Sequence, residues 1–303
     1  MTVRYVLAID GGGTKVLAEL TEQSSQLTFR SQGGPASISN DLDLAVENIV
    51  KVVRDVCEQS GAKASDIVAV MGLAGGASTT LAEQVKVMLK LIYEIEFASL
   101  RIESDAITSL YGANLGEPCV VVALGTGAVG ARLQSKNQAK LVGGWGFTVD
   151  DFGGGARIGL MAVQYLLNDI DCYDLPKSRL TIRLSEQLGC TRQAISHWLK
   201  QAKPADYARF SPLVFSLQNE CKVANKVLTE HTTSVVELIN KSRGTSPLPV
   251  ILIGGLAKVS QDLLPLTLQN ELSPCKGDSL TGAAILAVKH YHDIIEKGQR
   301  NEP

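Results

Sequence analysis

The sequence of 303 residues lacks the features that mark several classes of protein. Its 29 Lys and Arg nearly balance 31 Asp and Glu, and a net charge of −2 provides no basic excess for nucleic acid or anionic lipid. No uncharged run approaches the roughly 20 apolar residues of a membrane helix. The first apolar stretch, Tyr5–Ile9, is too short for the core of a signal peptide. We therefore expect a cytoplasmic protein that binds neither nucleic acid nor membrane.

Two site patterns are also missing. The six cysteines are scattered, with no C-x-x-C pair and no Cys/His cluster at zinc spacing, so we expect reduced thiols and no zinc site. The P-loop pattern G-x-x-x-x-G-K-[ST] leading into a helix does not occur. The glycines before Lys15 are followed by the apolar, strand-like segment Lys15–Leu20, which predicts a hairpin instead.

What the sequence does contain is a strand-plus-glycine segment used three times. The segments are VLAIDGGGTK at Val6–Lys15, VVALGTGAVG at Val121–Gly130 and VILIGGLAK at Val250–Lys258. Each places an apolar strand before a turn whose backbone amides form a concave nest of partial positive charge. One such turn is an ordinary loop in many α/β domains, but three in this order indicate a nucleotide-binding protein.

The order of predicted elements indicates an α/β protein built from two similar halves. In the first half, strands at Val3–Asp10, Ile67–Leu73 and Leu100–Glu103 alternate with helices at Leu42–Gln59 and Leu81–Leu91. The second half repeats the strand–turn–strand plan at Cys119–Leu133, 114 residues after the first, becomes helical to about Arg243 and returns to a strand at Val250–Ile253. A closing helix is expected at Leu280–Ile295.

A dinucleotide-binding turn is the competing interpretation of the middle segment. Gly125-x-Gly127-x-x-Gly130 follows a strand, and Asp150 lies 20 positions later, as in the G-x-G-x-x-G fingerprint. That fingerprint must open a helix, whereas Val129–Leu133 has the pattern of a strand. The context therefore argues against it.

Several acidic residues are candidates for chemistry. A kinase acting on an alcohol needs amide cradles and Mg²⁺ for the phosphates, and a carboxylate to accept the hydroxyl proton. Asp10 is placed to hold Mg²⁺ through water, Thr14 and Thr126 offer hydroxyls beside the turns, and Asp105, at a strand-to-helix edge, is the candidate base. An Asp at such an edge equally serves as a helix N-cap, and both roles stay open.

A second group of polar residues lies around Trp145. Asp150 and Asp151 precede a triple glycine and either accept hydrogen bonds from sugar hydroxyls or cap the helix expected at Ala156. Trp145, between glycines, either covers a sugar face or packs half-buried between domains.

These motifs together resemble a known family. AIDGGGTK, GLAGGAS, ESDAITSLYGA, LGTGAVG, GGWGFTVDDFGGGARIG, DYARFSP, LIGGLAK and GDSLTGAAILA follow the order found in the N-acetylglucosamine and glucosamine kinases of the BadF/BadG/BcrA/BcrD ATPase family, within the actin, Hsp70 and sugar-kinase superfamily. The resemblance implies two ribonuclease-H-like lobes with an interdomain cleft, residues 1–115 plus 286–303 and residues 116–285. It implies ATP and Mg²⁺ as cofactors, an amino sugar phosphorylated at its 6-hydroxyl, and a homodimer.

The resemblance also implies roles for individual residues. Asp105 would be the catalytic base and Asp10 the magnesium ligand. The residues expected at ATP are Gly11, Gly12, Gly13, Thr14, Lys15, Gly125, Thr126, Gly127, Gly254 and Gly255, and those expected at the sugar are Ser37, Gly76, Asp105, Gly144, Trp145 and Asp151.

Three positions depart from the family pattern, all of them on the sugar side. Ser37 stands where these kinases usually carry an Asn, Val129 replaces an Asn or other residue, and Phe152 replaces a Glu or Gln. An unmatched buried polar group on the substrate costs about 1–3 kcal/mol. The departures therefore bear on the identity of the sugar and not on the use of ATP.

Two other functions fit the same scaffold. A dehydratase-activating ATPase needs thiolate ligands for an iron–sulfur cluster, and the cysteine nearest the second glycine turn, Cys119, lies inside an apolar strand. A sugar or nucleotide sensor would bind in the cleft without turnover.

Overall fold

The computed structural model describes residues 3–134 and 138–300, which divide into two compact units. The first unit holds residues 3–118 and 275–300, and the second holds residues 119–134 and 138–274. The C-terminal share of the first unit thus begins at Cys275 and not at residue 286, because α12 (Ser279–Arg300) is one continuous helix that packs on α3, β1 and β4.

The first unit is built on a five-stranded mixed sheet in the order β3-β2-β1-β4-β5. Its strands are β1 (Tyr5–Gly11), β2 (Val16–Glu22), β3 (Thr28–Gly33), β4 (Ile67–Leu73) and β5 (Ser99–Ser104). β1 and β2 form the expected hairpin, with Gly11 opposite Val16. β1, β4 and β5 run parallel, so their carboxyl ends meet at one edge of the sheet.

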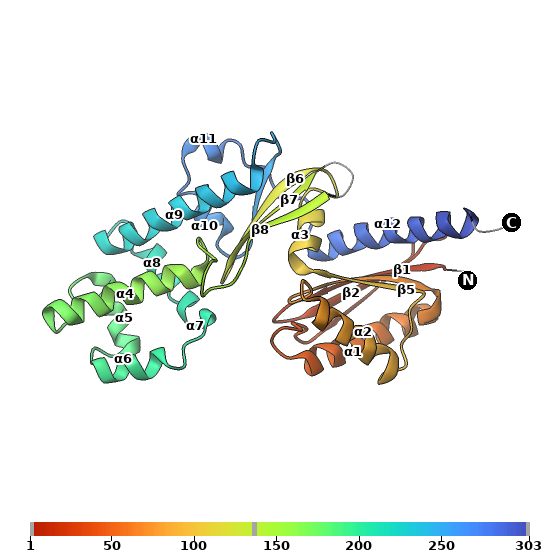
Figure 1. Cartoon of the computed structure of the whole chain (residues 1–303), viewed down its shortest axis with the longest axis horizontal. Helices are drawn as coiled ribbons and strands as arrows, with labels where there is room; N and C mark the ends of the chain where they lie inside the picture. Colours follow the sequence, from red (N-terminus) through yellow and green to blue (C-terminus); the bar gives the residue numbers. More distant parts are fainter. Residues whose placement is uncertain (1–2, 135–137, 301–303) are drawn as a thin grey trace. The chain divides into compact units, whose positions relative to one another are not determined.

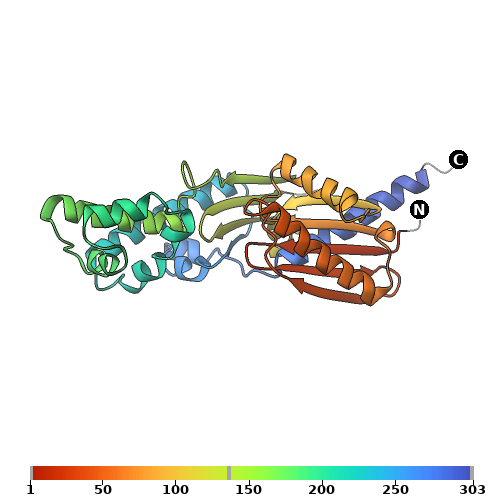
Figure 2. The ribbon, with the colours of Figure 1, turned by 90° about the horizontal axis from the view of Figure 1, so that it is seen from below.

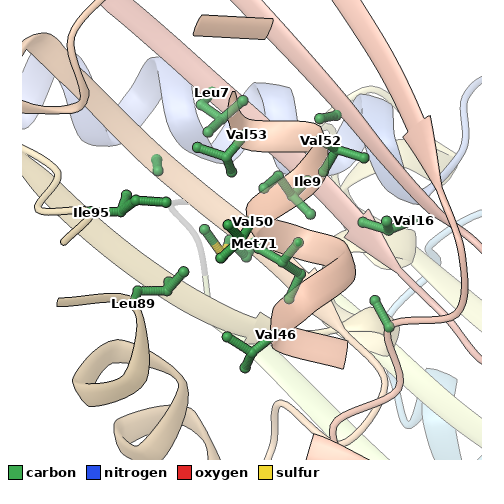
Figure 3. Packing of buried hydrophobic residues seen from close by; sticks show 14 of the residues in the cluster. Leu7, Ile9, Val16, Val46, Val50, Val52, Val53, Met71, Leu89 and Ile95 are labelled. Carbon is green, nitrogen blue, oxygen red and sulfur yellow. The ribbon is translucent and has the colours of Figure 1, made fainter. Parts of the chain in front are cut away.

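Helices cover both faces of this sheet. Figure 1 shows α1 (Leu42–Ser60) and α2 (Thr79–Leu91) on one face and α12 on the other, and Figure 2 shows α1 and α2 lying across the strands. α1 begins where Asp41 caps the Leu44 amide, and it ends at Gly61, which adopts the left-handed region. Its buried valines pack on Leu7, Ile9 and Met71 of the central strands (Figure 3).

The second unit repeats the same strand order in a four-stranded sheet, β8-β7-β6-β9. Its strands are β6 (Cys119–Leu124), β7 (Ala128–Gln134), β8 (Gln138–Gly143) and β9 (Val250–Ile253). β6 pairs antiparallel with β7 and parallel with β9, as β1 does with β2 and β4. The turn after β6 joins two antiparallel strands, so the prediction that it leads into a strand and does not open a helix is confirmed.

The second unit is completed by helices that follow β8 and β9. Between these strands lie α4 (Gly155–Tyr173), α5 (Arg179–Leu188), α6 (Arg192–Leu199), α7 (Pro204–Ala208), α8 (Ser211–Ser216) and α9 (Lys222–Arg243), and after β9 come α10 (Ala257–Gln261) and α11 (Leu266–Gln269). α9 packs against β6, β7 and β8, while α4 gathers a helical core around Phe210 and Leu166. In residues 3–134 and 138–300, no helix combines the length and apolar composition of a membrane span.

Candidate active site

Most of the predicted site residues of the first unit meet at the carboxyl edge of its sheet. The Ala74 amide donates to the Gly11 carbonyl at 2.8 Å, and the Ala36 amide donates to the Gly12 carbonyl at 2.8 Å. Ile38 donates in turn to Ala74 at 3.0 Å. These bonds join the loops that carry Gly11–Lys15, Ser37 and Gly76 into one surface.

Gly76 shows how close this packing is. A Cβ atom at Gly76 would lie 2.2 Å from the carbonyl oxygen of Glu103, at the end of β5. The loop after β4 can therefore reach the strand that leads into Asp105 only with glycine at this position. Gly13, Thr14 and Lys15, in contrast, are exposed at the tip of the hairpin, where their groups are accessible to a ligand.

Asp105 is the first residue of α3 (Asp105–Ala113), and it is not the cap of this helix. The cap is Ser104, whose hydroxyl accepts from the Ile107 amide at 3.3 Å. The Asp105 carboxylate accepts from the adjacent Ala106 amide at 2.9 Å, and the residue is exposed. Desolvation raises the pKa of Asp105, and the backbone amides of Ala106 and Asp105 oppose this rise. The carboxyl group is thus left available to act as a base.

Asp10, at the end of β1, is half-buried among other charged groups. Burial raises its pKa, a hydrogen bond from Ser279 opposes the rise, and the neighbouring carboxylates of Asp278 and Asp105 add to it. The exposed Lys15 lowers the pKa of Asp10. Burial and the neighbouring carboxylates therefore disfavour the ionised form of Asp10, and a cation bound beside it would offset that cost.

The donor set of this edge fits magnesium bound mainly through water and phosphate. Within residues 3–134 and 138–300, no three carboxylate, His or Cys side chains gather closely enough to form a direct metal cage. Mg²⁺ in phosphoryl-transfer sites typically keeps several waters and takes one or two carboxylates beside the substrate phosphates. Asp10 satisfies that requirement.

The second unit brings its own predicted residues together around the turn Gly125–Gly127. The Gly155 and Ala156 amides donate to the Gly125 and Thr126 carbonyls at 2.8 and 2.9 Å, which fixes the start of α4 against the turn. Asp151 lies on the other side, because a Cβ at Gly127 would come within 2.7 Å of its Oδ2. Thr126 is exposed at the tip.

Asp151 does not cap α4, whose N-cap is Gly154 with no side-chain hydrogen bond. Its backbone lies in the left-handed region, with φ at 62°, and its carboxylate accepts from the Ala128 amide. Burial raises the pKa of Asp151, and Asp150 adds to the rise. The structure thus holds a partly desolvated carboxylate beside the glycine turn.

Asp150 supports the loop that presents Trp145. Its Oδ2 accepts from the Trp145 amide at 3.1 Å, and Arg157 donates to its carbonyl at 2.8 Å. Trp145 itself is 83% exposed in this unit and lines a groove of about 530 Å³ with Val149, Phe152 and other residues. Gly144 lies against Val129, since a Cβ at Gly144 would be 2.8 Å from the valine side chain.

The turn after β9 lies against the end of β6 in the same unit. Leu256 donates to the Leu124 carbonyl at 3.0 Å, and Gly254 has φ at 95° with its α-carbon packed on the same carbonyl. Gly255 is exposed. The second and third glycine segments of the sequence are therefore neighbours.

The three departures from the family pattern differ in their surroundings. Ser37 is buried and its hydroxyl lies 3.2 Å from that of Ser39. Phe152 is exposed and stacks under the Arg157 guanidinium, 4.4 Å from the ring centre. Val129 packs under Gly144, as described above.

The sequence profile of the BadF/BadG/BcrA/BcrD ATPase family matches residues 7–276. The chain belongs to this family. The resemblance stated from the motifs is thereby confirmed, and so is the α/β fold of actin-like ATPases and sugar kinases.

Relatives of this chain align with it over nearly its whole length. It is 28% identical over 302 residues to the glucosamine kinase GspK of Vibrio cholerae, covering 98% of this chain and 100% of the relative. It is 28% identical over 316 residues to the N-acetyl-D-glucosamine kinase of Dictyostelium discoideum, covering 95% and 99%. A candidate N-acetylglucosamine kinase from Chromobacterium violaceum has a TM-score of 0.82 and 29% identity, with 95% and 100% covered.

Three residues near Asp10 in this family member were not identified from the sequence. Asp278 directly precedes α12, Ser279 is its first residue, and Thr108 lies one turn into α3. Asp278 caps α12 through the Thr281 amide and hydroxyl, both at 2.8 Å; although burial tends to raise the pKa of Asp278, these hydrogen bonds lower it overall. The motifs GDSLTGAAILA and ESDAITSLYGA contain these residues, but nothing in either motif indicated that they lie near Asp10.

Proposed function

We propose that this protein is an ATP-dependent kinase that phosphorylates the 6-hydroxyl of glucosamine or N-acetylglucosamine. The observation that carries the proposal is that the Asp105 carboxylate does not cap its own helix. Its helix is capped by Ser104, so the Asp105 carboxylate is not consumed by a structural role and is accessible at the end of β5. The names of the relatives and the family support the choice of ATP and of an amino sugar.

In this proposal each unit contributes its own group of residues. Asp105 accepts the proton of the sugar hydroxyl as the oxygen attacks the terminal phosphorus, and its raised pKa makes it a stronger acceptor than an ordinary carboxylate. Amides of the turns at Gly12–Lys15 and Gly125–Gly127 hold the phosphates. Asp10 would hold Mg²⁺ through water, and bound Mg²⁺ neutralises the charge that develops on the phosphate oxygens.

The sugar side of the proposal rests on the second unit. Asp151 would accept hydrogen bonds from sugar hydroxyls, and the exposed Trp145 offers a flat apolar surface for the sugar ring. Gly76 and Ser37 would contribute from the first unit. From the family resemblance alone we also propose a cytoplasmic homodimer, which light scattering on the purified protein would test.

The first experiment is an ADP-release assay with ATP and Mg²⁺ across a panel of amino sugars and plain hexoses. We expect turnover with glucosamine or N-acetylglucosamine, and analysis of the product by NMR should show the phosphate on the 6-oxygen. Binding of sugar without turnover by the wild-type protein would indicate a sensor. Iron in anaerobically purified protein would favour a dehydratase activator, although Cys119 is buried in β6.

The second experiment replaces the base. Asp105→Asn should lower kcat by roughly 10²- to 10⁴-fold, the range for loss of a general base, with little change in ATP affinity. Asp43→Asn is the matched control, because Asp43 is also an exposed acid in the first turn of a helix. Wild-type turnover by Asp105→Asn would refute the assignment.

A further inference from the structure

The helix that begins at Asp105 touches the C-terminal helix backbone to backbone. A Cβ at Gly112 of α3 would lie 1.8 Å from the carbonyl oxygen of Asp278, and a Cβ at Gly282 of α12 would lie 1.8 Å from the carbonyl oxygen of Thr108. Glycine at both positions is what permits this approach. The segment Thr108–Gly112 of α3 and the first turn of α12 are consequently fixed against each other.

Two hydroxyl groups lie at this contact, next to Asp10. Thr108 is fully buried, and its Oγ1 lies 2.7 Å from the Oγ of Ser279. The Ser279 side chain also lies close enough to Asp10 to lower the pKa of its carboxyl group. Thr108 also packs on Gly72, the residue paired with Asp10 in the sheet, since a Cβ at Gly72 would come 2.3 Å from Oγ1.

The hydrogen atoms available decide the direction of these bonds. An ionised carboxylate can only accept, and each hydroxyl has one hydrogen to donate. In a hydrogen bond between Ser279 and Asp10 the serine is therefore the donor, which leaves its oxygen free to accept from Thr108. The other acceptors near Thr108 are the carbonyls of Asp105 and Ser104, at 3.1 and 3.4 Å, both farther than Ser279.

We propose that Ser279 is a positioning residue that holds the Asp10 carboxylate in its metal-binding orientation and ties it, through Thr108, to the helix that presents Asp105. The inference rests on the proposed function, because it concerns the metal that accompanies the nucleotide. The hydrogen bond that Ser279 donates is charge-assisted, and such bonds are about twice as strong as neutral ones. Losing it frees the Asp10 side chain to turn away.

Calorimetric titration of ADP, once with Mg²⁺ and once with EDTA, tests this without relying on turnover. In Ser279→Ala the gain in ADP affinity that Mg²⁺ provides should fall about 10-fold, while the affinity in EDTA stays at the wild-type value. Ser279→Thr keeps a hydroxyl and should restore the gain. Thr281→Val is the matched control, because its hydroxyl lies in the same turn but bonds Asp278.

The possible outcomes separate the inference from the function. A wild-type gain in Ser279→Ala overturns the inference and leaves the kinase proposal intact, whereas a wild-type protein that binds no ADP overturns both. If Ser279→Ala unfolds, Thr108→Val replaces it as the test, since it keeps the buried shape and removes the second hydroxyl. Thr108→Val should lower the Mg²⁺-dependent gain and leave ADP binding in EDTA unchanged, and an unaltered gain would overturn the inference.

Discussion

Replacing Gly282 by Ala would test the contact between α3 and α12 directly. In an isolated helix this change is favourable by about 1 kcal/mol, because glycine is a poor helix former. Here the added Cβ would lie 1.8 Å from the Thr108 carbonyl oxygen and 2.6 Å from the Gly112 nitrogen. Since carbon–oxygen contacts of this kind are about 3.3 Å at the closest, the two helices would have to separate by about 1.5 Å.

The expected cost follows from this displacement. Overpacking a well-packed site costs about 1–3 kcal/mol, and the upper end applies because both obstructing atoms belong to the backbone. After subtraction of the helix-propensity gain, we expect a net loss of about 2 kcal/mol in the free energy of unfolding of the first unit. For a unit of this size that loss lowers Tm by about 4–8 °C.

Differential scanning calorimetry would follow the transition of the first unit, with Gly13→Ala as the control. The only atom recorded within 4 Å of a Cβ at Gly13 is the Asn40 amide nitrogen, at 3.9 Å, so this variant should melt within about 1 °C of the wild type. An unchanged or higher Tm in Gly282→Ala would refute the backbone-to-backbone contact. It would also remove the basis for the link between Ser279 and Thr108.

Two further predictions concern buried polar groups. Burial lowers the pKa of His231 in the folded protein to about 4, whereas in the unfolded chain it is 6.5. As the pH falls below 6.5 the unfolded chain therefore binds a proton that the folded protein does not, and the free energy of unfolding should decline by about 3 kcal/mol by pH 4. Urea unfolding at pH 7.5 and 5 measures this loss of unfolding free energy. The loss should be smaller in His231→Gln than in the wild type, and it should be unchanged in the control His197→Gln, whose histidine is exposed. Removing the α3 cap in Ser104→Ala should cost about 1 kcal/mol in the same assay at pH 7.5, and no loss would show that Asp105 caps the helix after all.

The sequence predicts the buried strands of this fold well because each is an apolar run that ends at residues typical of a turn. Ile67–Leu73 and Val250–Ile253 occur with the predicted bounds, each an apolar run closed by a turn. β3 was not predicted, since Thr28–Gly33 alternates exposed and partly buried residues and contains few apolar side chains. It is a strand because β2 pairs with it, which is information that the local sequence does not contain.

The roles of individual polar residues depend on contacts between distant parts of the chain. Sequence alone left Asp105 as either a base or a cap, and only the geometry of Ser104 decides which residue caps α3. Ser279 could not be singled out, because its hydroxyl partner Thr108 is 171 positions away. Asp150 and Asp151, adjacent in sequence, have different surroundings because Asp151 turns in the left-handed region.

The repeated strand order has a consequence for the history of the chain. If one ancestral module was duplicated and fused, β1 to β4 correspond to β6 to β9, and the turns at Gly11–Lys15 and Gly125–Gly127 are copies of each other. In the described residues of the second sheet, β5 has no counterpart. Because β5 delivers the chain to Asp105, only one of the two copies carries the proposed base, so on this proposal the duplication of a symmetrical module led to a catalytic group that belongs to one half alone.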